Sequence, residues 1–249
     1  MNIAKTLRQR TNPIRYRFLG RGHRRVFFKQ MLLQIYFTFV MSIHIIVFLG
    51  FMIGLVISAQ SHIGFSILGS KEGVGDIMVY TLFREVAPLA AILLIIARSV
   101  TAVASEVATM KVGSEIDALD ILGIHTGRYI WAPRIVAGGI STFCSSFLFW
   151  IISLFGIWLG SNLNSHFPVS QVISSVSNTI TIPDIAFYVI KTVCPGFLIF
   201  YIACKRGMAA GYSPHEVPIA TNSAVVEALM FCFVCHFVLS TMFYLLVGF

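Results

Sequence analysis

The chain has 249 residues, of which 57% are hydrophobic and only 11% are charged, whereas an average soluble domain is about 25% charged. This composition excludes an ordinary soluble protein and predicts an all-α integral membrane protein. The net charge of +8 does not indicate nucleic-acid binding, because nine of the 18 Lys and Arg residues lie within residues 1–29. A basic end beside an apolar stretch is typical of a cytoplasmic anchor at anionic headgroups.

Residues 1–34 are predicted to form a basic interfacial segment. Arg24, Arg25 and Lys29 are interleaved with Phe27 and Phe28, a mixture that suits a helix lying in the membrane interface. No short apolar region ending in a small-residue cleavage site is present, so we expect the first span to remain in the mature protein. A disordered basic tail is the alternative, since Gly and Pro residues interrupt the segment.

Five apolar stretches are long enough to cross a bilayer, which needs about 20 residues for each helix. They run at about 35–59, 77–104, 135–159, 185–204 and 224–247, so residues 35–249 are expected to form one five-helix membrane domain. With the N-terminus inside, 14 basic residues fall on the cytoplasmic side and only Lys71 falls outside. The positive-inside rule therefore predicts a cytoplasmic N-terminus and an exterior C-terminus. The Ser-rich and Asn-rich stretch of about 160–182 is predicted to be an exterior connection.

Charged residues inside spans cost about 2.5 to 3.5 kcal/mol each at the helix centre, so they need partners or water. We expect an intramembrane polar cluster of four residues, namely Arg84, Glu85, Arg98 and Lys191. Glu85 is the expected partner of Lys191, and Pro88 can free a backbone carbonyl nearby. The alternative is an ion pair that only locks two helices together.

Two further patterns concern helix contacts. Gly50 and Gly54 form a small-xxx-small pattern that permits close helix approach, either for packing alone or for helix movement. The connection of about 106–133 is predicted to contain a helix parallel to the membrane on the cytoplasmic face, whose acidic side, with Glu115, Asp117 and Asp120, would suit a basic groove on a partner. A plain solvated loop is the alternative there.

Several separated motifs resemble those of MlaE-type permeases, which serve MCE-associated phospholipid transporters. The resemblance covers roughly residues 35–248 and departs from the family pattern at residues 211–217. The motifs, in chain order, are Arg84-Glu85-Val86-Ala87-Pro88, Ala97-Arg98-Ser99, Glu106-Val107-Ala108-Thr109-Met110, Glu115-Ile116-Asp117-Ala118-Leu119, Pro133-Arg134, Ile190-Lys191-Thr192, and Ala220-Thr221 with Ala224-Val225-Val226.

This resemblance implies that residues 35–249 are a five-helix permease domain, and that two copies form a homodimer in the bacterial inner membrane that moves phospholipid and maintains outer-membrane lipid asymmetry. It also implies two cytoplasmic ABC ATPases, an exterior ring of MCE-domain protein and a possible small regulatory subunit. The helix with Glu115, Asp117 and Asp120 is then expected to be the coupling helix that binds the ATPase. The cavity-facing segment of the family matches Ile57, Gln60, Phe65 and Leu68, which we expect to line a lipid cavity. The chain has no G-x-x-x-x-G-K-[ST] segment, so ATP and Mg are expected on the partner ATPase, with no cofactor in this chain.

Other functions remain open at this point. Cys232, Cys235 and His236 form a C-x-x-C-H sequence that is typical of haem attachment, but the sequence lies inside the fifth apolar span, where attachment machinery has poor access. A non-ATP-driven transporter or channel is the main alternative function. A membrane-embedded enzyme is less favoured, because no metal-binding or nucleophile motif is present.

Overall fold

A computed structural model describes residues 21–68, 79–124, 126–164 and 169–247. Within these residues all the regular secondary structure is helical. Its elements are α2 (Arg21–Thr38), η1 (Val40–Ser42), α3 (Ile43–Leu68), η2 (Leu82–Val86), α5 (Ala87–Ile95), η3 (Ile96–Val100), α6 (Thr101–Val112), α7 (Glu115–Ile121), η4 (Gly127–Trp131), α8 (Ala132–Asn164), α9 (Val169–Thr179), α10 (Ile182–Met208) and α11 (Glu216–Val247).

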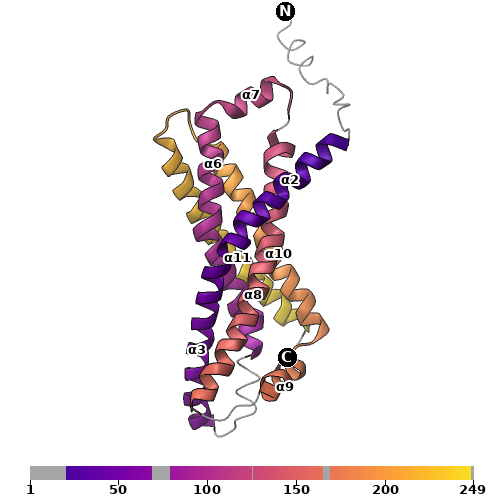
Figure 1. Ribbon diagram of the computed structural model, residues 1–249, viewed down its shortest axis with the longest axis vertical. Helices are drawn as coiled ribbons and strands as arrows, with labels where there is room; N and C mark the ends of the chain where they lie inside the picture. Colours follow the sequence, from indigo (N-terminus) through magenta and orange to yellow (C-terminus); the bar gives the residue numbers. More distant parts are fainter. Residues whose placement is uncertain (1–20, 69–78, 125, 165–168, 248–249) are drawn as a thin grey trace, which may run out of the picture.

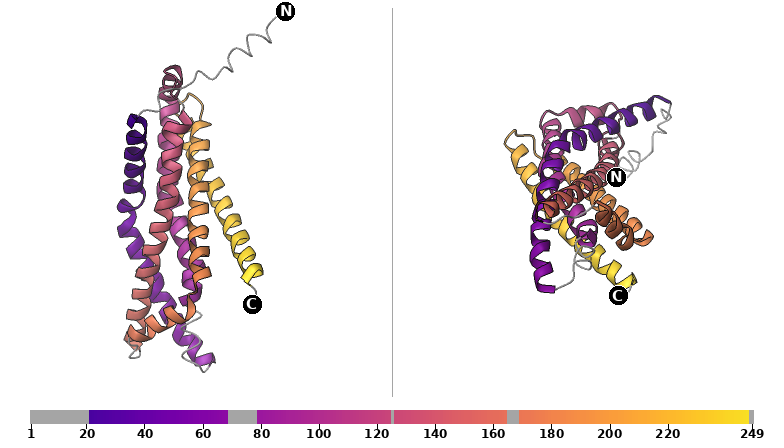
Figure 2. Two further views of the ribbon diagram at one scale, coloured as in Figure 1. Left: turned by 90° about the vertical axis from the view of Figure 1, so that its right-hand side faces the viewer. Right: turned by 60° about the horizontal axis from the view of Figure 1, so that its bottom comes forward.

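Five helical segments are long and apolar enough to cross a membrane, which confirms the predicted fold class. They are Arg25–Gln60, Val79–Val112, Tyr129–Asn162, Ile182–Met208 and Glu216–Leu245. Short helices α7 and α9 lie at opposite ends of the long bundle (Figure 1). A view turned by 90° shows α11 diverging from the other helices toward its C-terminal end (Figure 2).

The N-terminal helix α2 leans away from the line of α3 (Figure 1). The sequence placed the end of the interfacial segment at residue 34, but α2 continues to Thr38 and passes through η1 into α3. At this junction, Ser42 Oγ donates to the carbonyl of Thr38 over 2.6 Å, which satisfies a backbone acceptor where the helix changes direction. The part of the predicted segment before residue 21 lies outside the described residues.

The second span contains two π-helical turns, η2 and η3. Such turns insert an extra residue into a helix and often occur at functional sites. Pro88 is the second residue after η2 and has no N–H to donate to the carbonyl of Arg84, four residues earlier. That carbonyl therefore needs another donor, as the sequence had indicated.

Close packing of α3 on α8 accounts for the small-xxx-small pattern of the first span. A Cβ atom on Gly54 would lie 2.9 Å from the Cα of Gly156, and one on Gly156 would lie 2.6 Å from the carbonyl oxygen of Phe51. The carbonyl of Gly50 accepts a 2.9 Å hydrogen bond from Ser153 Oγ. Helix packing within the subunit is thus sufficient to explain these glycines.

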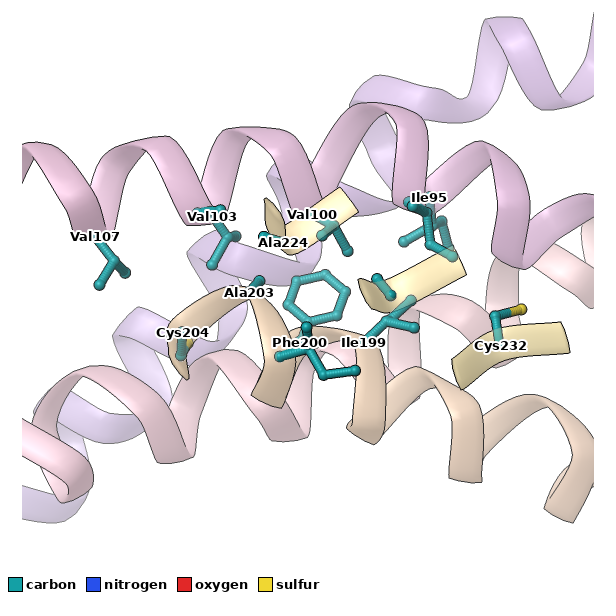
Figure 3. Close-up of a cluster of buried hydrophobic side chains, with 14 of the residues drawn as sticks. Ile95, Val100, Val103, Val107, Ile199, Phe200, Ala203, Cys204, Ala224 and Cys232 are labelled. Atoms are coloured by element: carbon teal, nitrogen blue, oxygen red, sulfur yellow. The ribbon is translucent and has the colours of Figure 1, made fainter. Parts of the chain in front are cut away.

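The largest apolar cluster joins η3 and α6 to α10 and α11 (Figure 3). Phe200 lies at its centre, with Val103 and Ala224 among its buried neighbours. Gly207 lets α10 approach α6 closely, because a Cβ there would lie 2.8 Å from the carbonyl oxygen of Ala104. This core connects α6, which leads to α7, with the two helices that end the chain.

The predicted exterior connection of 160–182 contains a helix that the sequence analysis missed. Helix α9 spans Val169–Thr179, and the spacing of Val169, Val172, Ile173 and Val176 is typical of an apolar helix face. The following helix, α10, begins at Ile182 because Thr181 and Asp184 form a capping box. The Thr181 backbone N–H donates to Asp184 Oδ2 over 3.0 Å, so the fourth span begins three residues before the predicted boundary.

Candidate functional site: a buried lysine cluster and a coupling helix

Lys191 is the centre of a polar cluster inside the bundle. Its side chain is 0% exposed, and its ammonium donates to Glu85 Oε2 over 2.6 Å, to the carbonyl of Arg84 over 2.9 Å and to Ser240 Oγ over 2.6 Å. An ammonium has three N–H donors, so all three are satisfied. The predicted contact between Glu85 and Lys191 is present, and the acceptor freed by Pro88 is bonded to the same ammonium.

Ser240, on the last helix α11, is the third side chain of this cluster. Its hydroxyl lies 3.1 Å from both carboxylate oxygens of Glu85, so η2, α10 and α11 meet at one group of polar atoms. Sequence reasoning missed Ser240, because a serine in an apolar span costs little and gives no signal of its own. Its hydrogen bonds with Lys191 and Glu85 are what distinguish it.

Arg84 lies in an aromatic box rather than in an ion pair. Its guanidinium carbon is 3.9 Å from the ring centre of Phe243, 4.5 Å from that of Tyr244 and 4.8 Å from that of Tyr80. The side chain is buried, and within the described part of the chain no carboxylate lies within ion-pair distance of it. Aromatic faces stabilise a desolvated guanidinium by about 2 kcal/mol, which offsets part of the cost of burying this cation.

The structure does not place Arg98 with these residues, and its assignment to the cluster is wrong. Arg98 lies on η3 and donates to Ser42 Oγ, on the first helical segment. Fourteen residues of helix separate it from Arg84, which corresponds to roughly 20 Å along the axis. Two separate cationic sites therefore exist along the second span.

The predicted lipid-cavity residues lie near the end of the first span. Ile57 is half-buried and Gln60 is exposed on α3. The side chains of Phe65 and Leu68 lie outside the described residues. Their role in a cavity therefore stays a prediction.

Helix α7 occupies the position predicted for the coupling helix, at the end of α6. Lys111 Nζ lies 2.8 Å from Asp117 Oδ1 and donates over 2.9 Å to the hydroxyl of Tyr212, in the connection between α10 and α11. The hydrogen bond from Lys111 lowers the pKa of Asp117 below its usual value. Asp120 accepts a hydrogen bond from Thr126 over 2.8 Å. Asp117 and Asp120 therefore have partners within the subunit, while Glu115 and Asp120 are exposed. Binding of an ATPase by these three residues stays a prediction.

Apolar side chains are the most exposed feature of this end. Ile121 is 86% and Leu122 is 73% exposed, at the C-terminal end of α7. Sequence reasoning chose the acidic residues because charge usually marks a surface. The exposed Ile and Leu pair gave no separate signal, since the same residues fill cores elsewhere in the chain.

Glu227 is a carboxylate within the fifth span, and two basic residues of α10 lie beside it. Arg206 Nε donates to one of its carboxylate oxygens, and Lys205 lies 3.5 Å from the other. These contacts join α10 to α11. The cost of a carboxylate in the fifth span is thus offset by two cations.

The histidine and cysteines of the fifth span form no evident metal site. All five cysteines are free thiols, and among the described residues no group of three or more His, Cys, Asp or Glu could hold a metal ion. Cys232 and His236 are buried in α11, in the interior of a continuous helix.

Comparisons with known proteins identify the family of the chain. The family model described as permease MlaE matches residues 31–242. The chain is 27% identical over 211 residues to a probable ABC transporter permease protein of Rickettsia typhi, covering 85% of this chain and 82% of the relative. It is 28% identical over 232 residues to the intermembrane phospholipid transport system permease protein MlaE of Haemophilus influenzae, covering 91% of this chain and 87% of that relative. Because the family model matches most of its length, the chain belongs to the MlaE permease family.

Proposed function

We propose that two copies of this chain form the membrane-spanning part of an ABC-type phospholipid transporter. Two separate cytoplasmic ATPases, carrying ATP and Mg, would drive it, and an exterior ring of MCE-domain protein would exchange lipid with it and so maintain outer-membrane lipid asymmetry. Membership of a permease family and a relative named for intermembrane phospholipid transport support this proposal. The orientation, with the N-terminus cytoplasmic and the C-terminus exterior, rests on the distribution of basic residues.

The observation that carries the proposal is the partial exposure of Glu85. Its side chain is 33% exposed in the single chain while its partner Lys191 is fully buried. A carboxylate facing acyl chains inside a membrane span is unfavourable. The face that carries Glu85 is therefore expected to meet a water-filled cavity or a second subunit, which is the arrangement a dimeric lipid path requires.

Arg84 supplies a suitable group for a phospholipid beside that face. Its guanidinium is held between aromatic rings and lacks a carboxylate partner among the described residues. Arg binds phosphate through paired hydrogen bonds. The aromatic rings would contact the glycerol and the upper acyl chains. The wall of the cavity would continue along four further residues, namely Ile57, Gln60, Phe65 and Leu68.

Helix α7 is the proposed site of ATPase contact. Ile121 and Leu122 present an apolar surface of the kind that partner proteins cover, and Glu115 adds an exposed charge beside it. The bond from Lys111 to Tyr212 and the core around Phe200 join this end to α10 and α11. A movement of α7 can therefore reach Lys191 and Ser240 through packed helices.

Reconstitution with the ATPase in nanodiscs tests the proposal. We expect the ATPase to co-purify, phospholipid to stimulate its activity, and labelled phospholipid to pass to the MCE protein only with ATP. Transport that proceeds without any ATPase would instead support the non-ATP-driven transporter or channel. A chemical product formed from the lipid would support an enzyme.

A further inference from the structure

A groove separate from the lysine cluster lies between the N-terminal helix and the second span. It consists of two adjoining cavities of about 400 and 360 Å³, which share Gln34, Phe37 and Glu106. One reaches Arg98 and Ser99 on η3, and the other reaches Arg134 at the start of α8. This size is in the range of pockets that hold small organic ligands, roughly 300 to 1,000 Å³.

Arg98 provides a fixed cationic group in this groove. Its Nη1 donates to the hydroxyl of Ser42, which is fully buried and is itself held by the carbonyl of Thr38. A guanidinium has five N–H donors, and no carboxylate of the described chain lies within ion-pair distance of this one. The junction of α2 with η1 therefore orients Arg98 but leaves most of its donors unused.

The remaining charges of the groove balance one another. Glu106 Oε1 lies 2.7 Å from Arg134 Nη2, so this carboxylate does not neutralise Arg98. Phe37 and Met41 add exposed apolar surface on the opposite wall. The groove thus combines one excess positive charge, polar groups near Gln34 and an apolar side, which matches an amphiphile that carries an anion.

We propose that this groove binds a glycerophospholipid of the cytoplasmic leaflet, with its phosphate on Arg98. The headgroup would lie between Arg98 and Gln34. Glu106 lies eight residues after Arg98, about 12 Å further along the helix, and is therefore at a distance from the phosphate. The acyl chains would leave past Met41 into the bilayer. The choice of the cytoplasmic leaflet rests on the membrane orientation proposed above. The site itself is distinct from the proposed transport path at Glu85 and Lys191.

A photo-crosslinking amino acid at Phe37 tests the site in the complete transporter. The complex would be held in nanodiscs of phosphatidylethanolamine and phosphatidylglycerol, washed with detergent and then irradiated. We expect a phospholipid adduct at Phe37 that survives the wash. A crosslinker at Val56, an exposed position on α3, is the matched control for loosely held lipid, and its adduct should be lost on washing.

Variants of the cationic group decide the outcome. Arg98→Met should reduce the retained adduct about tenfold, as expected for loss of one charge-assisted contact, while Arg98→Lys should retain part of it. Ser42→Ala keeps the cation but releases its orientation, and should reduce the adduct a few-fold even if Arg98→Met does not assemble. Glu85→Gln changes the proposed transport path but not the groove, so it should leave the adduct unchanged. A failure of the transport proposal can therefore be distinguished from a failure of this inference.

Three results would overturn the inference. An adduct at Phe37 that washes away as readily as the one at Val56 would show ordinary annular lipid. A retained adduct that neither Arg98→Met nor Ser42→Ala reduces would show that the phosphate is not bound there. A crosslink from Phe37 to a peptide of residues 1–20 would show that the chain itself covers the groove.

Discussion

Replacing the two charged partners at the centre of the bundle is the most informative perturbation. Lys191→Met removes an ammonium that makes three hydrogen bonds. The carbonyl of Arg84 loses this donor, and the carboxylate of Glu85 keeps only the hydroxyl of Ser240. Breaking a buried pair from one side costs about 3 to 5 kcal/mol. We expect a loss of that size in the free energy of unfolding.

Glu85→Gln should cost less, about 1.5 to 3 kcal/mol. The amide oxygen can still accept from Lys191, and the carboxylate it replaces is 33% exposed, where water screens its charge. However, this variant leaves two neighbouring cations, Arg84 and Lys191, without an anion. The double variant removes the ammonium as well, so its cost should fall short of the sum by about 1 to 3 kcal/mol.

The assay is a double-mutant cycle, with unfolding followed by loss of helical circular dichroism in mixed micelles and with lipid-stimulated ATPase activity measured in parallel. Arg98→Met combined with Lys191→Met is the matched control, because the two residues lie far apart and their effects should add. If Glu85→Gln and Lys191→Met also add strictly, the two side chains do not interact. If every single variant transports lipid normally, the cluster has no role in transport.

Further predictions concern helix packing and coupling. Gly156→Leu should prevent α3 from packing on α8 and reduce the yield of folded protein, as measured by size-exclusion chromatography, whereas Gly127→Ala, where a Cβ meets nothing within 4 Å, should not. Ile121→Asp should weaken ATPase co-purification at least tenfold; unchanged co-purification would exclude this contact. Tyr212→Phe keeps the ring but removes the hydroxyl, so ATPase binding should persist while lipid stimulation falls. The pKa of Asp117 is lowered in the folded protein. The contribution of its carboxylate to stability is therefore fully present above its unfolded pKa of about 3.9, and it is lost only as the pH falls through the lower folded value. Asp117→Asn should accordingly have the same effect on ATPase binding at pH 6 as at pH 8.

Local properties of the sequence were sufficient to predict the membrane spans and one tertiary contact, that between Glu85 and Lys191. Hydropathy and length predict membrane helices because the bilayer requires every span to satisfy its backbone internally and to present apolar side chains. The same cost of burying charge limits the partners available to Lys191, so Glu85 could be chosen from sequence. The missing N–H of Pro88 likewise pointed to a free carbonyl.

Other features depend on helix register and on the approach of distant helices, which local patterns do not encode. The sequence placed Arg98 with Lys191 because both are charged and apolar residues surround both, but the length of helix between Arg84 and Arg98 separates them. Ser240 and the rings around Arg84 carry no charge signal, so only their convergence identifies them. Local patterns likewise did not indicate that Lys111 and Thr126 bind two of the acidic residues of α7.

The sequence by itself thus determined that five helices cross a membrane and that Glu85 and Lys191 share a site, because both follow from the free energy of placing each residue in lipid. The tertiary structure alone decided which polar groups meet. Two π-helical turns in the second span, and close helix contacts at Gly156 and Gly207, set the rotation and spacing of the helices. These long-range contacts place Arg84 among aromatic rings and Arg98 in the separate groove between the N-terminal helix and the second span.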